Sequence, residues 1–269
     1  KRLDGHPPRQ PLRILLAEDN KVNQQFATIL LERAGHIVEV AENGHHAVDA
    51  VRRVPFDVVL MDIQMPELDG VGATREIRGL PGPERDIPII AMTAHAMSGA
   101  KEEYLAAGMN DYVTKPIDTQ LLLAKLNDIA DGLPVPDETA FKASDEDVPQ
   151  LDLTKLAELG RVLPFSKVKE LALLYLIDIE LRLASIVEQR ARGDLSAVGR
   201  DAHTIVSVSG NIGAMRASAA ARRLETACRA RRKENTYELI SELNEACIAS
   251  SDLIRAWLKE MAPPEAQAV

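Results

Sequence analysis

Aromatic residues and cysteines are scarce in this chain. Phe, Trp and Tyr make up 3% of its 269 residues while 46% are hydrophobic, so any core must be mainly aliphatic. Its cysteines, Cys228 and Cys247, are too few for a zinc site and suit small buried residues in a reducing compartment. Neither a secretory signal nor an apolar run of roughly eighteen residues is present. We therefore expect a cytoplasmic segment without membrane contact.

Acidic residues outnumber basic ones, 41 to 32. The formal net charge is -9, and no helix-turn-helix or RNA-binding signature is present, which argues against nucleic acid as a partner. One local exception is a group of arginines that suits either a solvated helix face or a docking patch for an acidic partner. This arginine group comprises Arg222, Arg223, Arg229, Arg231 and Arg232.

Short apolar runs alternate with amphipathic stretches in the first half of the chain. The runs are too short for helices and suit buried parallel strands; they lie at 14–17, 58–61, 89–92 and 112–113. The amphipathic stretches cover 22–34, 44–53, 70–78, 98–107 and 119–130. A five-fold strand–helix alternation predicts a doubly wound α/β fold, with a five-stranded parallel sheet and helices on both faces.

Polar residues stand where these runs end, and ligands of parallel sheets collect beyond that edge. Glu18, Asp19 and Asp62 would repel one another there unless a hard divalent cation, Mg²⁺ or Mn²⁺, were bound by their oxygens. One carboxylate could then attack phosphorus, with the Lys115 ammonium and the Thr93 hydroxyl neutralising the charge. Each residue alone suits an ordinary turn, but five in register favour a phosphoaspartate site.

Residues 12–131 resemble a receiver domain of a two-component response regulator. The resemblance rests on LLAEDN at 15–20, MDIQMPELDG at 61–70, MTA at 92–94 and YVTKP at 112–116. It implies that Asp62 is the phosphoacceptor. For the metal, it implies direct ligation by Asp19, ligation through water by Glu18 and ligation through the backbone carbonyl by Gln64. For the phosphoryl group, it implies contacts from Thr93 and Lys115. It also implies an aromatic switch residue at Tyr112 and a cis Lys115–Pro116 bond.

Other chemistries for such a sheet are less well supported. A haloacid-dehalogenase-like phosphatase needs a second Asp two residues after the nucleophile, where this chain has Gln64, so a phosphoaspartate here should be a signal. A flavodoxin or dinucleotide binder needs a Gly-rich loop after the first strand, and residues 20–23 offer none. Four histidines are expected outside the acidic cluster, at the surface or at helix ends: His36, His45, His46 and His95.

The composition changes after residue 131. Residues 1–11 form a tail and 12–131 the first domain; 132–150 carry three prolines and an acidic excess, typical of a linker. Beyond it, apolar residues recur at helical spacing. Helices are predicted at 152–160, 165–192, 194–209, 214–231 and 234–261, which form an antiparallel bundle over 151–262 before a tail at 263–269.

The segment AHTIVSVSGNIGA at 202–214 resembles the histidine phosphotransfer family. The resemblance implies that His203 is an exposed helical acceptor, and a neutral imidazole is a competent nucleophile. Val206 stands where the family usually has Lys, and Ser207 where Gly is commoner. Either Arg200, one turn before His203, supplies the charge, or the bundle has become a binding module. A surface histidine on an unrelated bundle is a third reading.

These features together predict a receiver and a phosphotransfer domain from the C-terminal part of a hybrid sensor histidine kinase. The chain has no Gly-rich ATP-binding motif, so we expect the kinase core either upstream in the same polypeptide or in another protein. Because the chain begins at Lys1, we expect it to be part of a longer parent protein, which membrane segments could anchor. A response regulator receiver is the expected downstream partner. The alternatives are a stand-alone relay protein and a phosphorylation-gated interaction scaffold.

Overall fold

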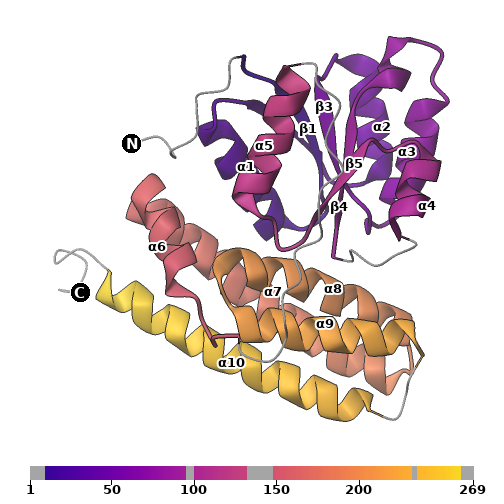
Figure 1. The fold of residues 1–269 in the computed structure, drawn as a ribbon. Helices are drawn as coiled ribbons and strands as arrows, with labels where there is room; N and C mark the ends of the chain where they lie inside the picture. Colours follow the sequence, from indigo (N-terminus) through magenta and orange to yellow (C-terminus); the bar gives the residue numbers. More distant parts are fainter. Residues whose placement is uncertain (1–9, 95–99, 132–147, 232–234, 262–269) are drawn as a thin grey trace. The chain divides into compact units, whose positions relative to one another are not determined.

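A computed structural model describes residues 10–94, 100–131, 148–231 and 235–261. The chain divides between Lys142 and Ala143 into an α/β unit and an all-helical unit (Figure 1), which confirms the predicted fold classes. Across the described ranges, no helix is both long and apolar enough to cross a membrane.

The first unit is built on a five-stranded parallel sheet with the order β2-β1-β3-β4-β5. The strands are β1 (Arg13–Ala17), β2 (Ile37–Ala41), β3 (Val58–Asp62), β4 (Ile89–Thr93) and β5 (Asp111–Thr114). The sequence did not single out β2 because Glu39 interrupts its apolar residues, and as an edge strand it leaves Ile37 and Val40 exposed.

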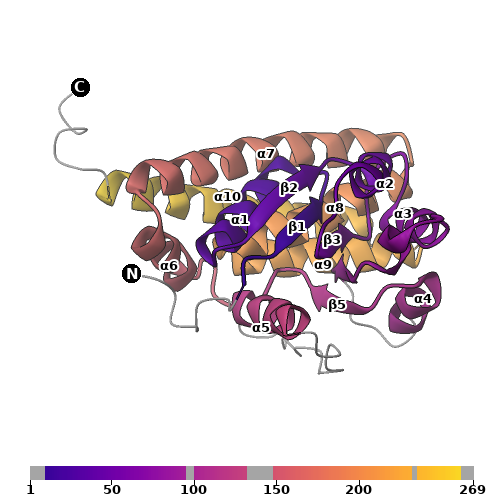
Figure 2. The same ribbon diagram turned by 90° about the horizontal axis from the view of Figure 1, so that it is seen from above.

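Helices cover both faces of this sheet (Figures 1 and 2). Successive strand residues point to opposite faces, so Ile14 and Leu16 join one buried cluster while Leu15 and Ala17 join the other. The first cluster packs beneath α1 (Lys21–Arg33) and α5 (Thr119–Ala130), and the second beneath α2 (Gly44–Arg53), α3 (Gly70–Arg78) and α4 (Ala100–Ala107). The 3-10 turn η1 (Pro83–Asp86) precedes β4.

Polar side chains fix where the helices of this unit begin. The Asn20 side chain accepts hydrogen bonds from the backbone of Val22 and Asn23, and Asp118 caps α5 in the same way. Such caps satisfy N–H groups that have no partner within the helix. Residues 18–20 therefore connect β1 to α1, and residues 115–118 connect β5 to α5, so these short segments lie beyond the edge of the sheet.

The second unit is a four-helix bundle with a short helix at one end. Helices α7 (Phe165–Ala191), α8 (Leu195–Ile212), α9 (Met215–Arg229) and α10 (Thr236–Glu260) pack in succession, and α10 closes against α7. The short helix α6 (Leu153–Val162) packs against α7 and α8. The interior is filled mainly by buried aliphatic residues, including Ile179, Ile205, Leu224 and Ile254, together with Tyr175 and Trp257. An aliphatic core follows from the scarcity of aromatic residues.

Gly213 joins the start of α6 to the end of α8. Its backbone has a positive φ of 92°, which favours glycine, and a Cβ there would lie 2.5 Å from the carbonyl oxygen of Asp152. The Asp152 N–H donates to the Gly213 carbonyl at 2.7 Å. The glycine in the histidine-containing segment thus serves the packing of the bundle.

Several smaller expectations have mixed outcomes. His45 and His46 are exposed, and His36 lies just after the end of α1, as the surface or helix-end expectation allowed. The His36 ring is nevertheless buried and accepts a hydrogen bond at Nδ1 from the Leu12 N–H at 3.2 Å. His95 lies outside the described residues, as does most of the linker at 132–150. Cys228 and Cys247 are buried, and burial raises the pKa of these thiols to about 11 and about 12.

Candidate phosphoacceptor sites

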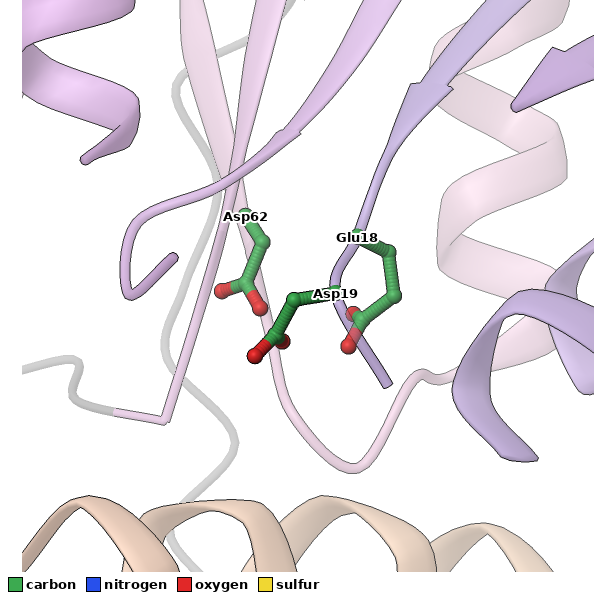
Figure 3. Close-up of side chains that lie close together, drawn as sticks. All are labelled: Glu18, Asp19 and Asp62. Atoms are coloured by element: carbon green, nitrogen blue, oxygen red, sulfur yellow. The ribbon is translucent and has the colours of Figure 1, made fainter. Parts of the chain in front are cut away.

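Three carboxylates meet at one edge of the sheet. Glu18 and Asp19 follow β1, Asp62 ends β3, and these two strands are neighbours. Figure 3 shows the three side chains directed toward one region, and an oxygen of each lies within 4.8 Å of the others. An all-oxygen donor set of this kind fits a hard divalent cation such as Mg²⁺.

Lys115, directly after β5, supplies the counter-charge. Its Nζ lies 2.7 Å from Oε2 of Glu18 and 2.7 Å from Oδ2 of Asp62, and all three side chains are buried. Burial alone would lower the pKa of Lys115, but the charges of Asp62 and Glu18 outweigh it, and the net effect raises the pKa. The ammonium therefore stays charged inside the site.

Residues of the first turn of α1 hold Glu18 in place. Its Oε1 accepts a hydrogen bond from the Asn23 side chain at 3.0 Å, and its backbone carbonyl accepts one from Gln24 Nε2 at 2.6 Å. Sequence reasoning overlooked Asn23 and Gln24, although buried polar residues in the first turn of a helix are a usable signal. With Lys115 on Oε2, both oxygens of the Glu18 carboxylate are oriented.

The loop from β3 to α3 approaches Asp62 closely. The Gln64 backbone N–H donates to Asp62 Oδ1 at 3.2 Å, whereas metal ligation by the Gln64 carbonyl remains a prediction. A Cβ at Gly70 would lie 2.1 Å from the Asp62 carbonyl oxygen, so the start of α3 can approach β3 only with glycine. Glu67 has a φ of 65°, an uncommon left-handed backbone for a glutamate.

Thr93 and Tyr112 lie on β4 and β5. Thr93 is buried at the end of β4, where its Oγ1 lies 3.0 Å from the hydroxyl oxygen of Tyr104 on α4. Tyr112 is half-buried and packs against the core beneath α2, α3 and α4. The predicted cis Lys115–Pro116 bond is confirmed.

His203 lies in the middle of α8 and faces a carboxylate of α9. Its Nδ1 lies 2.9 Å from Oε1 of Glu225. With Glu225 ionised, this contact requires the ring proton on Nδ1 and leaves the lone pair on Nε2, because a carboxylate only accepts hydrogen bonds. The expectation of an exposed ring is wrong, since His203 is 4% exposed.

A cation of α9 contacts the carboxylate that faces His203. Arg229 lies one turn after Glu225, and its guanidinium is 3.6 Å from the same Oε1 atom. Arg223 instead pairs with Glu242 of α10. Arg200 is exposed and donates to the Ser196 hydroxyl at 3.1 Å, and Val206 is fully buried.

Sequence reasoning missed Glu225 and did not connect Arg229 of the arginine group with His203, because both residues belong to a different helix. A signal for Glu225 was available: it interrupts the apolar stripe of α9 that contains Ala221, Leu224 and Cys228. A lone acidic residue on a buried helix face requires a polar partner, and His203 is that partner.

Each half of the chain matches a known protein family. Residues 14–127 match the response regulator receiver domain family, and residues 170–253 match the Hpt domain family. The chain is a receiver domain followed by an Hpt domain. It is homologous to the C-terminal parts of hybrid sensor kinases of the BarA and GacS type.

Two relatives illustrate this homology. The receiver part is 46% identical over 109 residues to the signal transduction histidine-protein kinase BarA of Shigella flexneri, covering 40% of this chain and 12% of that protein. Both domains align with the sensor protein GacS of Pseudomonas syringae pv. syringae, with 33% identity over 258 residues, covering 92% of this chain and 28% of GacS. The chain thus spans less than a third of either relative.

Similar solved structures include the receiver domain of the sensor histidine kinase PA1611 from Pseudomonas aeruginosa, described with a magnesium ion in its active-site cleft. The identity is 41% and the TM-score 0.42, covering 46% of this chain and 99% of that one. Another is the complex of the Saccharomyces cerevisiae phosphotransfer protein Ypd1 with the receiver domain of Ssk1, at 26% identity and a TM-score of 0.43, covering 49% of this chain and 97% of that one.

Proposed function

We propose that this receiver–Hpt module carries a phosphoryl group on Asp62 and exchanges it with His203. The observation that carries the proposal is the bridge from the Lys115 ammonium to Glu18 and Asp62 in a site with three converging carboxylates. Phosphoryl transfer depends on positioning and charge neutralisation, and this site provides both.

In the receiver half, Asp62 is the nucleophile. A carboxylate oxygen attacks phosphorus, and the bond from phosphorus to the donor's leaving group breaks. A bound Mg²⁺ or Mn²⁺, held by Asp19 and Asp62, by Glu18 through water and by the Gln64 carbonyl, would neutralise charge on the phosphoryl oxygens. Lys115 and Thr93 are the phosphoryl contacts on the protein side.

In the Hpt half, His203 Nε2 is the attacking atom. Its lone pair forms the N–P bond as the P–O bond to an aspartate breaks and the carboxylate leaves. The ring keeps its Nδ1 proton and gains a positive charge, which the Glu225 carboxylate offsets at 2.9 Å. Because His203 is 4% exposed, its Nε2 edge must become accessible to the donor.

Val206 carries no positive charge, so it cannot stabilise a phosphoryl group on His203 and leaves this residue a weaker acceptor. Arg200, one turn earlier on α8, is a candidate phosphate neighbour in its place. The second candidate function is a binding module that does not transfer phosphate, and the burial of both Val206 and His203 favours it.

We further propose that residues 132–150 link a receiver at 12–131 to a separately folded Hpt domain at 151–262. Gln150 is already anchored in the bundle, since its Nε2 donates to the Ala246 carbonyl at 2.7 Å. The phosphodonor is a histidine kinase core, in the same polypeptide or in another protein, and a receiver of a response regulator is the downstream partner. Neither nucleic acid nor a membrane contact enters this scheme.

The test is labelling of the whole chain with acetyl phosphate and Mg²⁺, followed by intact mass and by the acid and base lability of the phosphate. We expect one phosphate that requires a divalent cation and disappears in Asp62→Asn. A base-stable fraction should disappear in His203→Gln but not in the exposed control His45→Gln. Labelling that survives both Asp62→Asn and EDTA would contradict the proposal. A chain labelled on Asp62 but never on His203 would support the binding module.

A further inference from the structure

A second tyrosine of the receiver contacts the threonine of the phosphoacceptor site. Tyr104 lies on α4, and its hydroxyl oxygen is 3.0 Å from Thr93 Oγ1. Thr93 is 2% exposed and Tyr104 is 7% exposed, so the pair is shielded from water. Tyr112, the aromatic residue that the sequence pointed to, lies on β5 instead.

The number of protons on the two hydroxyls dictates how the pair responds to phosphorylation. Each hydroxyl has one proton to donate and two lone pairs that accept. A phosphoryl group on Asp62 offers only acceptor oxygens, so Thr93 must donate its proton to it. The Thr93–Tyr104 bond then persists only if Tyr104 is the donor. The arrival of the phosphoryl group therefore selects one direction for the chain of hydrogen bonds, from Tyr104 through Thr93 to phosphate.

We propose that Tyr104 is a positioning residue that orients the Thr93 hydroxyl toward the phosphoryl group and couples the occupancy of Asp62 to α4. The inference rests on the proposed role of Asp62 as phosphoacceptor. Hydrogen bonds in series strengthen one another where water is excluded, so the Tyr104 hydroxyl improves the donor that Thr93 presents. The same bond ties α4 more firmly to the end of β4 in the phosphorylated protein.

The experiment measures Asp62 phosphorylation by acetyl phosphate in the whole chain carrying His203→Gln. In this reaction an Asp62 oxygen forms a bond to phosphorus, and the P–O bond to acetate breaks with its electron pair leaving on acetate. Tyr104→Phe removes one hydroxyl and keeps the ring. We expect the initial rate to fall about threefold to tenfold, the loss typical of one buried hydrogen bond.

Two controls separate positioning from packing. Tyr175→Phe also removes a buried tyrosine hydroxyl, one that lies 3.3 Å from Ser209 Oγ in the helical unit, and should leave the rate unchanged. In a Thr93→Ala background, Tyr104→Phe should change the rate by less than about twofold, because the residue through which it acts is gone. A purely structural effect of Tyr104 would persist in that background.

Amide NMR spectra report the coupling to α4 directly. Phosphorylation should shift the Glu103 and Leu105 amides in the parent and shift them less in Tyr104→Phe. Equal labelling rates and equal amide shifts in the parent and in Tyr104→Phe would overturn the inference. It would also be overturned if Tyr104→Phe slowed labelling equally in the parent and in the Thr93→Ala background. Failure of the parent chain to label at all would instead overturn the role of Asp62, and this inference with it.

Discussion

The Nζ atom of Lys115 lies 2.7 Å from Oδ2 of Asp62, and both side chains are 2% exposed. Asp62 ends β3 and Lys115 follows β5, so the contact joins two strands that are separated in the sheet by β4. A buried carboxylate is tolerated only when it is paired, so Lys115 stabilises the unphosphorylated site as well as the phosphorylated one.

Replacing Lys115 by Met should therefore affect both stability and chemistry. We expect the free energy of unfolding in EDTA to fall by about 3–5 kcal/mol, because Glu18 and Asp62 lose their buried partner. Mg²⁺ should restore part of the loss, and Asp62 labelling should slow on the order of 100-fold. Lys125→Met breaks another buried ion pair, with Asp111, and should destabilise the protein without any gain from Mg²⁺. Urea unfolding with and without Mg²⁺ checks the difference.

Removing Glu225 should change the chemistry of His203. In Glu225→Ala the ring loses the acceptor that holds its proton on Nδ1, so ¹⁵N NMR should show a mixture of tautomers. Base-stable phosphate should fall about tenfold, and about threefold in Arg229→Ala, whose exposed charge is screened by solvent. Arg223→Ala also removes a positive charge from α9, but Arg223 pairs with Glu242, so this variant should change neither the tautomer nor the amount of base-stable phosphate. A fixed tautomer in Glu225→Ala would contradict the assignment.

Gly70 is the backbone position most sensitive to a methyl group near Asp62. Gly70→Ala would place a Cβ 2.1 Å from the Asp62 carbonyl oxygen, so α3 and β3 must separate. We expect a loss of about 1–3 kcal/mol in unfolding free energy and slower labelling of Asp62. Gly79→Ala at the end of the same helix meets its nearest neighbour at 3.4 Å and should be tolerated. Comparable losses in both variants would show that the close approach to Asp62 is not the cause.

His36 should make receiver stability depend on pH. Burial lowers the pKa of its imidazole, and Nδ1 accepts the Leu12 N–H only when it is unprotonated. Since the unfolded chain then binds more protons, this contribution is complete above the unfolded pKa of roughly 6.5 and is lost as the pH falls through the folded value. Between pH 7.5 and 5.5 the parent should lose on the order of 1 kcal/mol more than His36→Asn, which keeps an acceptor without titrating.

The exposed His45 provides the control for this pH dependence. His45→Asn also removes one imidazole, but from an exposed position on α2, and should lose stability on acidification by as much as the parent does. Urea midpoints at the two pH values give the comparison. If His36→Asn and His45→Asn behave alike, carboxylates alone account for the loss at low pH.

The sequence by itself determined the fold classes, the helices and the acidic cluster. Helix periodicity and short apolar runs are local properties, so α1, α2, α3 and α5 begin and end within a residue or two of their predicted limits. The residues at the ends of β1, β3 and β5 could be grouped because parallel strands bring their carboxyl ends to one edge. The position of the edge strand β2 was not predicted, because this strand lacks an uninterrupted apolar run.

Only the tertiary structure decided which distant side chains meet. Glu225 reaches His203 because α9 packs against α8, and Tyr104 reaches Thr93 because α4 packs against the sheet beside β4. It also buried the ring of His203, which the resemblance had implied to be exposed, and the ring of His36, which had been expected at the surface or at a helix end. The physical reason is that helix and strand periods fix the face on which a residue lies, whereas its partner depends on how separate elements pack.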